Sequence, residues 1–224
     1  MNDTAVAGRH HVVQRWTFRF RFLIHLFYDI SANSPVVLAD NPIIITPNHK
    51  SFADHWIIAL SFSRHIFERQ IPFRFLGHHP EHFPRAFRWI IRFIWWAYGV
   101  VSIEKGESNT IQKLRTVLKE HGQTVIMYPE GTRVRDGSAL RRFRLRIVRL
   151  HRESGAKILP VAIQFKKAPS TKILGINIPI GRRRCVVNFA REATNLPELG
   201  SLQDEADWLR FQVEQLYDTA RESL

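Results

Sequence analysis

Short apolar runs alternate with amphipathic stretches through most of this chain, and that alternation limits the folds it can adopt. The apolar runs have the length and composition of strands and lie at residues 36–38, 43–46, 73–76, 99–103, 124–127, 158–163 and 186–189. Helices are predicted at about residues 54–68, 109–121, 139–153 and 206–220. Alternating strands and helices indicate α/β architecture: a single domain with a central mixed sheet flanked by helices.

Composition is consistent with one globular domain. The chain has 224 residues, of which 45% are hydrophobic, so it is long enough and apolar enough to bury a core. Its single cysteine, Cys185, excludes an internal disulfide. The adjacent histidine pairs at residues 10–11 and 78–79 lack partners at zinc-like spacing, so we expect no metal site.

Two polar strings, each directly after an apolar run, carry the chemistry. Asn48-His49-Lys50-Ser51-Phe52-Ala53-Asp54 places an aspartate five residues after a histidine. A histidine held by a carboxylate is a general base for a hydroxyl nucleophile. Tyr128-Pro129-Glu130-Gly131-Thr132-Arg133 combines a carboxylate, a glycine and an arginine in one turn, which suits an anionic, phosphate-bearing molecule. Each string is a weak signal alone, and their joint occurrence in this order is the informative pattern.

With these strings the chain resembles the glycerolipid acyltransferases of the 1-acylglycerol-3-phosphate (lysophosphatidate) acyltransferase type. The first string is similar to that family's NHxxxxD block, and the second to its FPEGTR block with tyrosine for phenylalanine. Residues 99–105 and 158–163 stand where the family has blocks like GxxFIDR and V-P-V-A. The resemblance covers about residues 36–191, most of the chain.

The resemblance implies a function and a set of site residues. His49 would be the catalytic base and Asp54 its partner, while the acceptor would be bound by Lys105, Glu130, Gly131, Thr132 and Arg133. The reaction would move a fatty acyl group from acyl-CoA or acyl carrier protein to a lysophospholipid hydroxyl in phospholipid biosynthesis, most simply that of 1-acylglycerol-3-phosphate. No cofactor is implied, because the acyl thioester is a co-substrate. Lys105 in place of the family's arginine, and residues 143–146 in place of an FKKG-like stretch, leave other lipid-alcohol acceptors open.

Charge and aromatic residues predict a membrane surface as a partner. The formal net charge is +13, and large aromatics alternate with arginines within residues 12–30 and 87–98. The longest run without Asp, Glu, Lys or Arg covers only residues 93–103, too short to span a bilayer. We therefore expect a peripheral or monotopic protein on the cytoplasmic face, with an N-terminal amphipathic membrane-associating helix that is interfacial or re-entrant. The stretch around residues 87–98, or a groove beside it, would hold the acyl chain.

The expected organisation has three parts. Residues 1–32 form the membrane-associating segment, residues 33–195 the acyltransferase domain, and residues 196–224 an acidic amphipathic helix at the C-terminal end. Two other functions fit parts of the pattern: a non-catalytic lipid-binding protein of the same fold, and a basic nucleic-acid binder. The second is disfavoured because the aromatic runs are rich in Ile, Leu and Phe and no nucleic-acid-binding signature is present.

Overall fold

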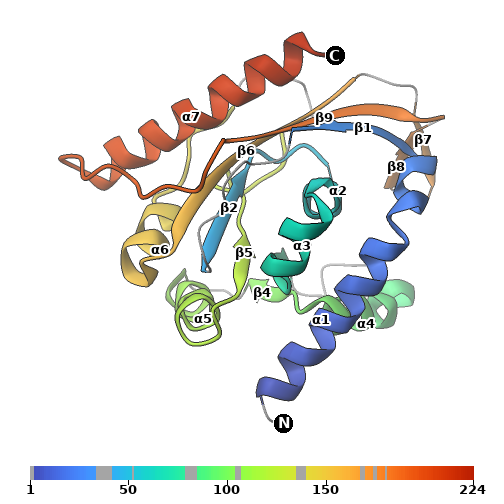
Figure 1. Cartoon of the computed structure of the whole chain (residues 1–224), viewed down its shortest axis with the longest axis horizontal. Coiled ribbons are helices and arrows are strands. Elements are labelled where there is room, and N and C mark those ends of the chain that lie inside the picture. Colours follow the sequence, from blue (N-terminus) through green and yellow to red (C-terminus); the bar gives the residue numbers. More distant parts are fainter. Residues whose placement is uncertain are drawn as a thin grey trace.

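The computed structural model describes residues 3–33, 42–51, 53–78, 85–103, 107–134, 140–166, 170–173, 176–179 and 181–224. Its centre is a seven-stranded sheet in the order β1-β9-β6-β2-β5-β3-β4 (Figure 1). The strands are β1 (Tyr28–Ala32), β2 (Ile43–Pro47), β3 (Phe73–His78), β4 (Val101–Ile103), β5 (Thr124–Ile126), β6 (Lys157–Phe165) and β9 (Arg183–Phe189). Neighbouring strands are parallel except β6 and β9, which are antiparallel, so the predicted mixed sheet is confirmed.

Helices cover both faces of this sheet (Figure 1). On one face lie α2 (Asp54–Ser61) and α3 (Arg64–Gln70), and on the other α5 (Glu107–Lys119), α6 (Arg146–Ser154) and α7 (Leu202–Glu222). Successive side chains of β2 point to opposite faces of the sheet: Ile43 and Ile45 pack with the first group of helices, and Ile44 packs with the second. The predicted single α/β domain with a helix-flanked sheet is therefore confirmed.

The N-terminal helix α1 (Asp3–Arg19) is held against the sheet by polar side chains. Gln14 donates through Nε2 to the Phe73 carbonyl and accepts the Phe73 N–H, both at 2.8 Å. The Thr17 and Tyr98 hydroxyls are 2.6 Å apart. The buried positions of α1 include Gln14, while Val12 and Trp16 are exposed. The amphipathic pattern predicted for this helix is not confirmed, because polar groups serve here as the docking face.

After α1 the chain passes through a 3-10 turn, η1 (Arg21–Leu26), and enters the sheet as β1. β1 pairs in parallel with β9, from Tyr28 opposite Arg183 to Ala32 opposite Val187. The sequence analysis had drawn the start of the domain at residue 33, but the sheet already includes these five residues. The alternating burial of β1, with Tyr28 and Ile30 partly covered, is typical of an edge strand.

Two predicted helices differ from the observed ones. The stretch at 54–68 is divided into α2 and α3, because Phe62 takes an extended conformation (ψ 147°) and inserts its ring between Phe73 and Phe189. The helix expected from about residue 139 begins only at Arg146, since the preceding backbone pairs with the loop after β5. In both places long-range contacts override a local helical pattern.

Other differences concern shorter elements. The predicted strand at 36–38 lies outside the described residues. A two-stranded antiparallel hairpin of β7 (Ser170–Ile173) and β8 (Ile176–Pro179) was not predicted. The last helix begins at Leu202, earlier than expected, because the Ser201 hydroxyl accepts the Asp204 N–H at its start.

Candidate active site

Both polar strings lie at one edge of the sheet. β2 and β5 are parallel neighbours, so the loops that leave their carboxyl ends emerge side by side. The loop after β2 carries His49 and the loop after β5 carries Glu130. A backbone hydrogen bond of 2.9 Å from the Val134 N–H to the His49 carbonyl joins the two loops. The topology thus brings together the two strings that the sequence analysis had linked.

His49 and Asp54 form the central pair. The imidazole Nδ1 is 2.8 Å from Asp54 Oδ2. The same carboxylate accepts the N–H groups of Lys50 (2.6 Å) and Ser51 (2.8 Å to Oδ2 and 2.9 Å to Oδ1). Asp54 is fully buried, whereas the His49 side chain is 19% exposed. A carboxylate at Nδ1 favours the tautomer with its proton there, which leaves Nε2 free to accept a proton from a ligand.

A second histidine, His55, follows Asp54 but has different surroundings. Its ring lies against Trp56 and Phe75, with centroids 5.0 and 5.1 Å away. Burial lowers the pKa of His55 to about 4, so this imidazole is neutral at pH 7 and a poor base. The geometry therefore favours His49 as the proton acceptor.

Asn48 anchors the loop that carries the histidine. Its side chain is fully buried and pairs with one residue of β6: Nδ2 donates to the Ile163 carbonyl (3.0 Å), and Oδ1 accepts the Ile163 N–H (2.7 Å). The amide thereby continues the β2–β6 pairing for one residue beyond Pro47. Sequence reasoning included Asn48 in the motif without giving it a role. Its position directly after an apolar strand and before the histidine was the feature that could have indicated this anchoring role.

The buried side chain of Glu130 joins the two loops by hydrogen bonds to their backbones. Its side chain is 2% exposed, Oε1 accepts the His49 N–H at 3.0 Å, and Oε2 accepts the Arg141 N–H at 3.2 Å. Burial raises the pKa of Glu130, and the two backbone donors act against that rise. Both carboxylate oxygens are thus engaged with the backbone. A direct contact between Glu130 and the acceptor stays a prediction from the family resemblance.

The ring of Tyr128 stacks on the His49 imidazole. The centroids of Tyr128 and His49 are 4.0 Å apart with an interplanar angle of 24°. The Tyr128 hydroxyl is buried and has no hydrogen-bond partner among the described residues, and burial raises its pKa well above the usual value. The ring therefore fixes the plane of the imidazole, while the hydroxyl adds a desolvation cost.

Replacing Tyr128 by phenylalanine is expected to leave activity unchanged and to stabilise the fold by about 1 kcal/mol, because it removes an unsatisfied buried hydroxyl. Urea unfolding of the purified protein measures this change. Tyr128→Leu is the matched variant, since it also removes the stacked ring and is expected to lower the rate. Loss of activity in Tyr128→Phe would instead assign the hydroxyl a part in the reaction.

The remaining predicted binding residues lie on the loop after β5. Gly131 has a left-handed conformation (φ 72°), which glycine adopts without strain. The Thr132 hydroxyl accepts a hydrogen bond of 3.0 Å from Arg141 Nη1. Arg133 is exposed. Lys105 lies outside the described residues, so its predicted role is not placed by the structure.

The C-terminal helix also contacts the site. Lys50, next to the histidine, lies with its Nζ 4.8 Å from the centroid of the Tyr217 ring of α7. Tyr217 is 4% exposed within the core layer that α7 shares with β6. The helix that the sequence analysis treated as a separate C-terminal segment thus supports the loop after β2. No local pattern in either segment predicted this contact.

An apolar groove of about 560 Å³ lies beside α2, the helix that Asp54 begins. It is lined by Val13, Trp16, Thr17, Phe20, Leu23, Ile24, Trp56, Leu60 and Tyr98. The predicted acyl-binding stretch at 87–98 contributes only Tyr98 to it. Within the described parts of the chain, no helix has both the length and the hydropathy needed to cross a bilayer.

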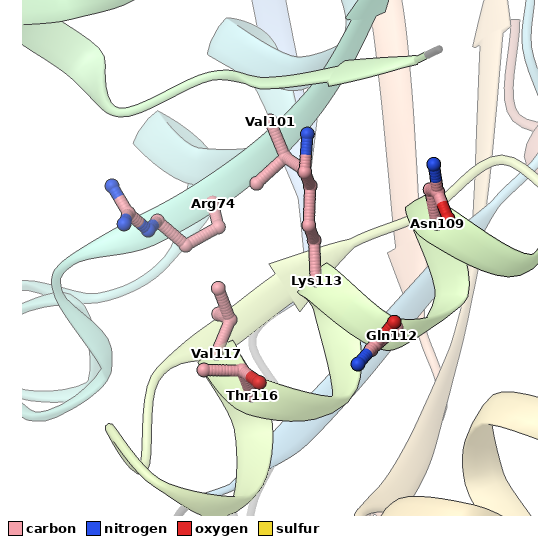
Figure 2. A pocket seen from close by; sticks show the side chains of 7 residues that line it. All are labelled: Arg74, Val101, Asn109, Gln112, Lys113, Thr116 and Val117. Atoms are coloured by element: carbon pink, nitrogen blue, oxygen red, sulfur yellow. The ribbon is translucent and has the colours of Figure 1, made fainter. Parts of the chain in front are cut away.

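A second hollow, of about 480 Å³, lies between α5 and the strands β3 and β4 (Figure 2). Lys113, Asn109 and Gln112 of α5 line it, together with Arg74 of β3. The Arg74 guanidinium donates through Nη1 to His10 Nδ1 (2.6 Å) and to the Gly99 carbonyl (3.2 Å), so it serves to hold α1. Among the described residues no group of three metal-ligating side chains is found, here or elsewhere.

Comparison with known proteins agrees with this geometry. Residues 28–164 match the family model described as Acyltransferase. In fold, the chain is similar to the crystal structure of PlsC, the 1-acyl-sn-glycerophosphate (LPA) acyltransferase from Thermotoga maritima, with a TM-score of 0.64 and 18% sequence identity. That match covers 96% of this chain and 79% of the other. Because the family match includes both loops of the site and most of the sheet, this protein belongs to the acyltransferase family.

Proposed function

We propose that this protein is an O-acyltransferase that moves a fatty acyl group from an acyl thioester to the free hydroxyl of 1-acylglycerol-3-phosphate. The observation that carries the proposal is the His49–Asp54 pair, 2.8 Å apart, joined through Glu130 to an arginine-bearing loop. This arrangement combines a base for a hydroxyl with cations for a phosphate. The resemblance of the two strings to the lysophosphatidate acyltransferases supports the same acceptor.

In the proposed reaction, His49 Nε2 removes the proton from the acceptor hydroxyl as that oxygen attacks the thioester carbonyl. The C–S bond then breaks, and the thiolate leaves with the proton that the imidazolium returns. Asp54 holds the Nδ1–H and stabilises the imidazolium while it exists. The products are the diacylated lipid and a free thiol, so protons and electrons balance without a cofactor.

Transfer is proposed to be direct, without an acyl-enzyme. The Ser51 hydroxyl accepts the Ala53 N–H at 3.0 Å and so helps to close the turn before α2. Cys185 is buried in the core, and burial raises the pKa of its thiol, which makes a thiolate nucleophile unfavourable. Neither side chain is placed as an activated nucleophile beside His49.

The decisive test is thiol release from a long-chain acyl-CoA, and separately from acyl carrier protein, by the purified protein in detergent. Lysophosphatidate is compared with lysophospholipids that bear larger headgroups, and His49→Ala is the blank. Release that depends on both lysophosphatidate and His49 supports the proposal. Release only with another acceptor would show that the acceptor is a different lipid alcohol. No release with any pair supports the non-catalytic lipid-binding alternative.

A membrane surface is proposed as the partner, on the cytoplasmic face. Exposed apolar side chains gather on two neighbouring parts of the chain. One part is α1, η1 and the residues that flank η1, with Trp16, Phe20, Phe22, Leu23, Leu26 and Phe27, and the other is α4 (Arg88–Tyr98), with Trp89, Phe93 and Trp96. α1 and α4 lie side by side (Figure 1) and are linked by a hydrogen bond of 3.1 Å from His10 Nε2 to the Trp96 carbonyl. Exposed or partly exposed arginines, including Arg19 and Arg92, accompany them. Aromatic rings interspersed with arginines suit the anionic headgroup region.

The double variant Trp89→Ser/Phe93→Ser is expected to weaken binding to phosphatidylglycerol vesicles roughly 10- to 100-fold, because two rings that are 69% and 61% exposed would no longer enter the lipid. Vesicle co-sedimentation measures the affinity. Phe211→Ser, which removes an exposed ring from α7, is the matched control and is expected to bind normally. Equal binding by the double variant would place the membrane contact elsewhere.

A further inference from the structure

The loop after β5 is packed against a second arginine-bearing segment, residues 140–145, which leads into α6. The Arg144 N–H donates to the Pro129 carbonyl at 2.9 Å, and the Arg141 N–H donates to Glu130 Oε2 at 3.2 Å. These bonds involve the backbone of both arginines. They hold the segment against the loop without using either guanidinium group.

Both guanidiniums nevertheless lie over the loop. Arg141 Nη1 donates to the Thr132 hydroxyl at 3.0 Å. A methyl group built on Gly131 would be 2.5 Å from Arg144 Nε and 2.8 Å from Arg144 Cζ, so the Arg144 side chain covers the bare Cα of the glycine. The absence of a Cβ at Gly131 is therefore what allows Arg144 to lie there.

Among the described residues, no carboxylate pairs with either of these two arginines. Neither Arg141 nor Arg144 forms an ion pair within the part of the chain that the structure describes. The nearest acid in the loop, Glu130, already accepts one backbone N–H on each oxygen. Two exposed guanidiniums that lie over the loop after β5, with Arg133 on that loop, are a site for a doubly charged anion.

We propose that Arg141 and Arg144 bind the phosphate monoester of the acceptor, and that they select it over acceptors whose phosphate is esterified twice. This inference rests on the proposed function. The acceptor is favoured over the phosphates of coenzyme A because the loop beneath the two arginines is bonded to His49. Glu130 Oε1 accepts the His49 N–H, and the Val134 N–H donates to the His49 carbonyl. An anion held at this loop therefore lies beside the group that must meet the acceptor hydroxyl.

Steady-state kinetics of the full chain in detergent test the assignment. Arg144→Ala and Arg141→Ala are each expected to raise KM for lysophosphatidate roughly 10-fold, with kcat little changed and KM for acyl-CoA unaltered. Arg144→Lys is expected to recover part of the loss, because lysine keeps the charge without the bidentate fork. Arg115→Ala, on the exposed face of α5, removes an equal charge and is expected to behave as the wild type.

Gly131→Ala supplies an independent variant that keeps both arginines. Its methyl group would displace the Arg144 side chain and strain the backbone at φ 72°, so KM for lysophosphatidate is expected to rise at least as much as in Arg144→Ala. Combining Gly131→Ala with Arg144→Ala is expected to add little further, since both changes remove one contact. A fully additive double variant would show that Gly131 acts by another route.

Calorimetric binding of lysophosphatidate separates failure of this inference from failure of the proposed function. Transfer with unchanged KM and Kd in both arginine variants would overturn the inference and leave the function standing, as would a rise in KM for acyl-CoA alone. Binding that depends on Arg141 and Arg144 without any transfer would support the inference and overturn the function. If the wild type neither bound nor acylated lysophosphatidate, both would fall.

Discussion

Replacing His49 by alanine is expected to lower acyl transfer roughly 10²- to 10⁴-fold, the range for loss of a general base. Without the imidazole, the site loses the proposed base that takes the hydroxyl proton as the oxygen attacks the thioester. The change should appear in kcat, because a general base acts in the transition state of the transfer step. Thiol release at saturating lysophosphatidate and acyl-CoA measures it.

The fold should survive this change. The His49 side chain is 19% exposed and makes one side-chain hydrogen bond, to Asp54, besides its stack on Tyr128. The hydrogen bonds that join the two loops use the backbone N–H and carbonyl of residue 49, which alanine retains. Circular dichroism and the unfolding midpoint should therefore stay near the wild-type values. Activity that persisted in a folded His49→Ala variant would disprove the general-base role.

Replacing Asp54 by asparagine is expected to lower both activity and stability. The carboxylate is fully buried and accepts three donors, namely His49 Nδ1 and the N–H groups of Lys50 and Ser51. An amide keeps one acceptor oxygen and turns its NH₂ group toward a donor, which leaves buried N–H groups unsatisfied. We expect a loss of roughly 2–4 kcal/mol in the free energy of unfolding.

The same substitution should lower kcat roughly 10²- to 10⁴-fold, because the imidazole loses the partner that fixes its tautomer and stabilises its charged form. Urea unfolding and thiol release, measured on the same preparation, report the two effects. Glu68→Gln is the matched control: Glu68 pairs with Arg64 on the exposed side of α3, so the change is expected to leave the unfolding midpoint near the wild-type value. A variant at Asp54 that unfolds like the wild type would show that the carboxylate does not hold the turn.

Much of the fold follows from local patterns. The runs Ile43–Ile45 and Ile158–Ile163 consist of apolar residues, and all of them became buried strand positions. Parallel strands leave their following loops at one edge, so motifs placed directly after two of them come together once those strands are neighbours. The sequence did not show that β2 and β5 are neighbours, because no local feature of a strand identifies the strand with which it pairs.

The places where the sequence misled share a cause. Leu140 and Phe143 keep helical spacing, yet the N–H groups of Arg141 and Arg144 bond to Glu130 and Pro129 instead of forming a helical turn. Gln14 of α1 is polar but buried, because it pairs with the backbone of Phe73. Such contacts join residues far apart in the chain, and periodicity carries no information about them.

The sequence by itself determined the chemistry available to this protein: a histidine and an aspartate five residues apart after one strand, and a glutamate, a glycine and an arginine after another. It also determined the α/β class, since strand and helix periods are properties of short windows. Only the tertiary structure decided how these groups act together. Glu130 became the buried brace between His49 and Arg141, residues 81 and 11 positions away, because burial at the junction of two loops requires each backbone N–H to find an acceptor.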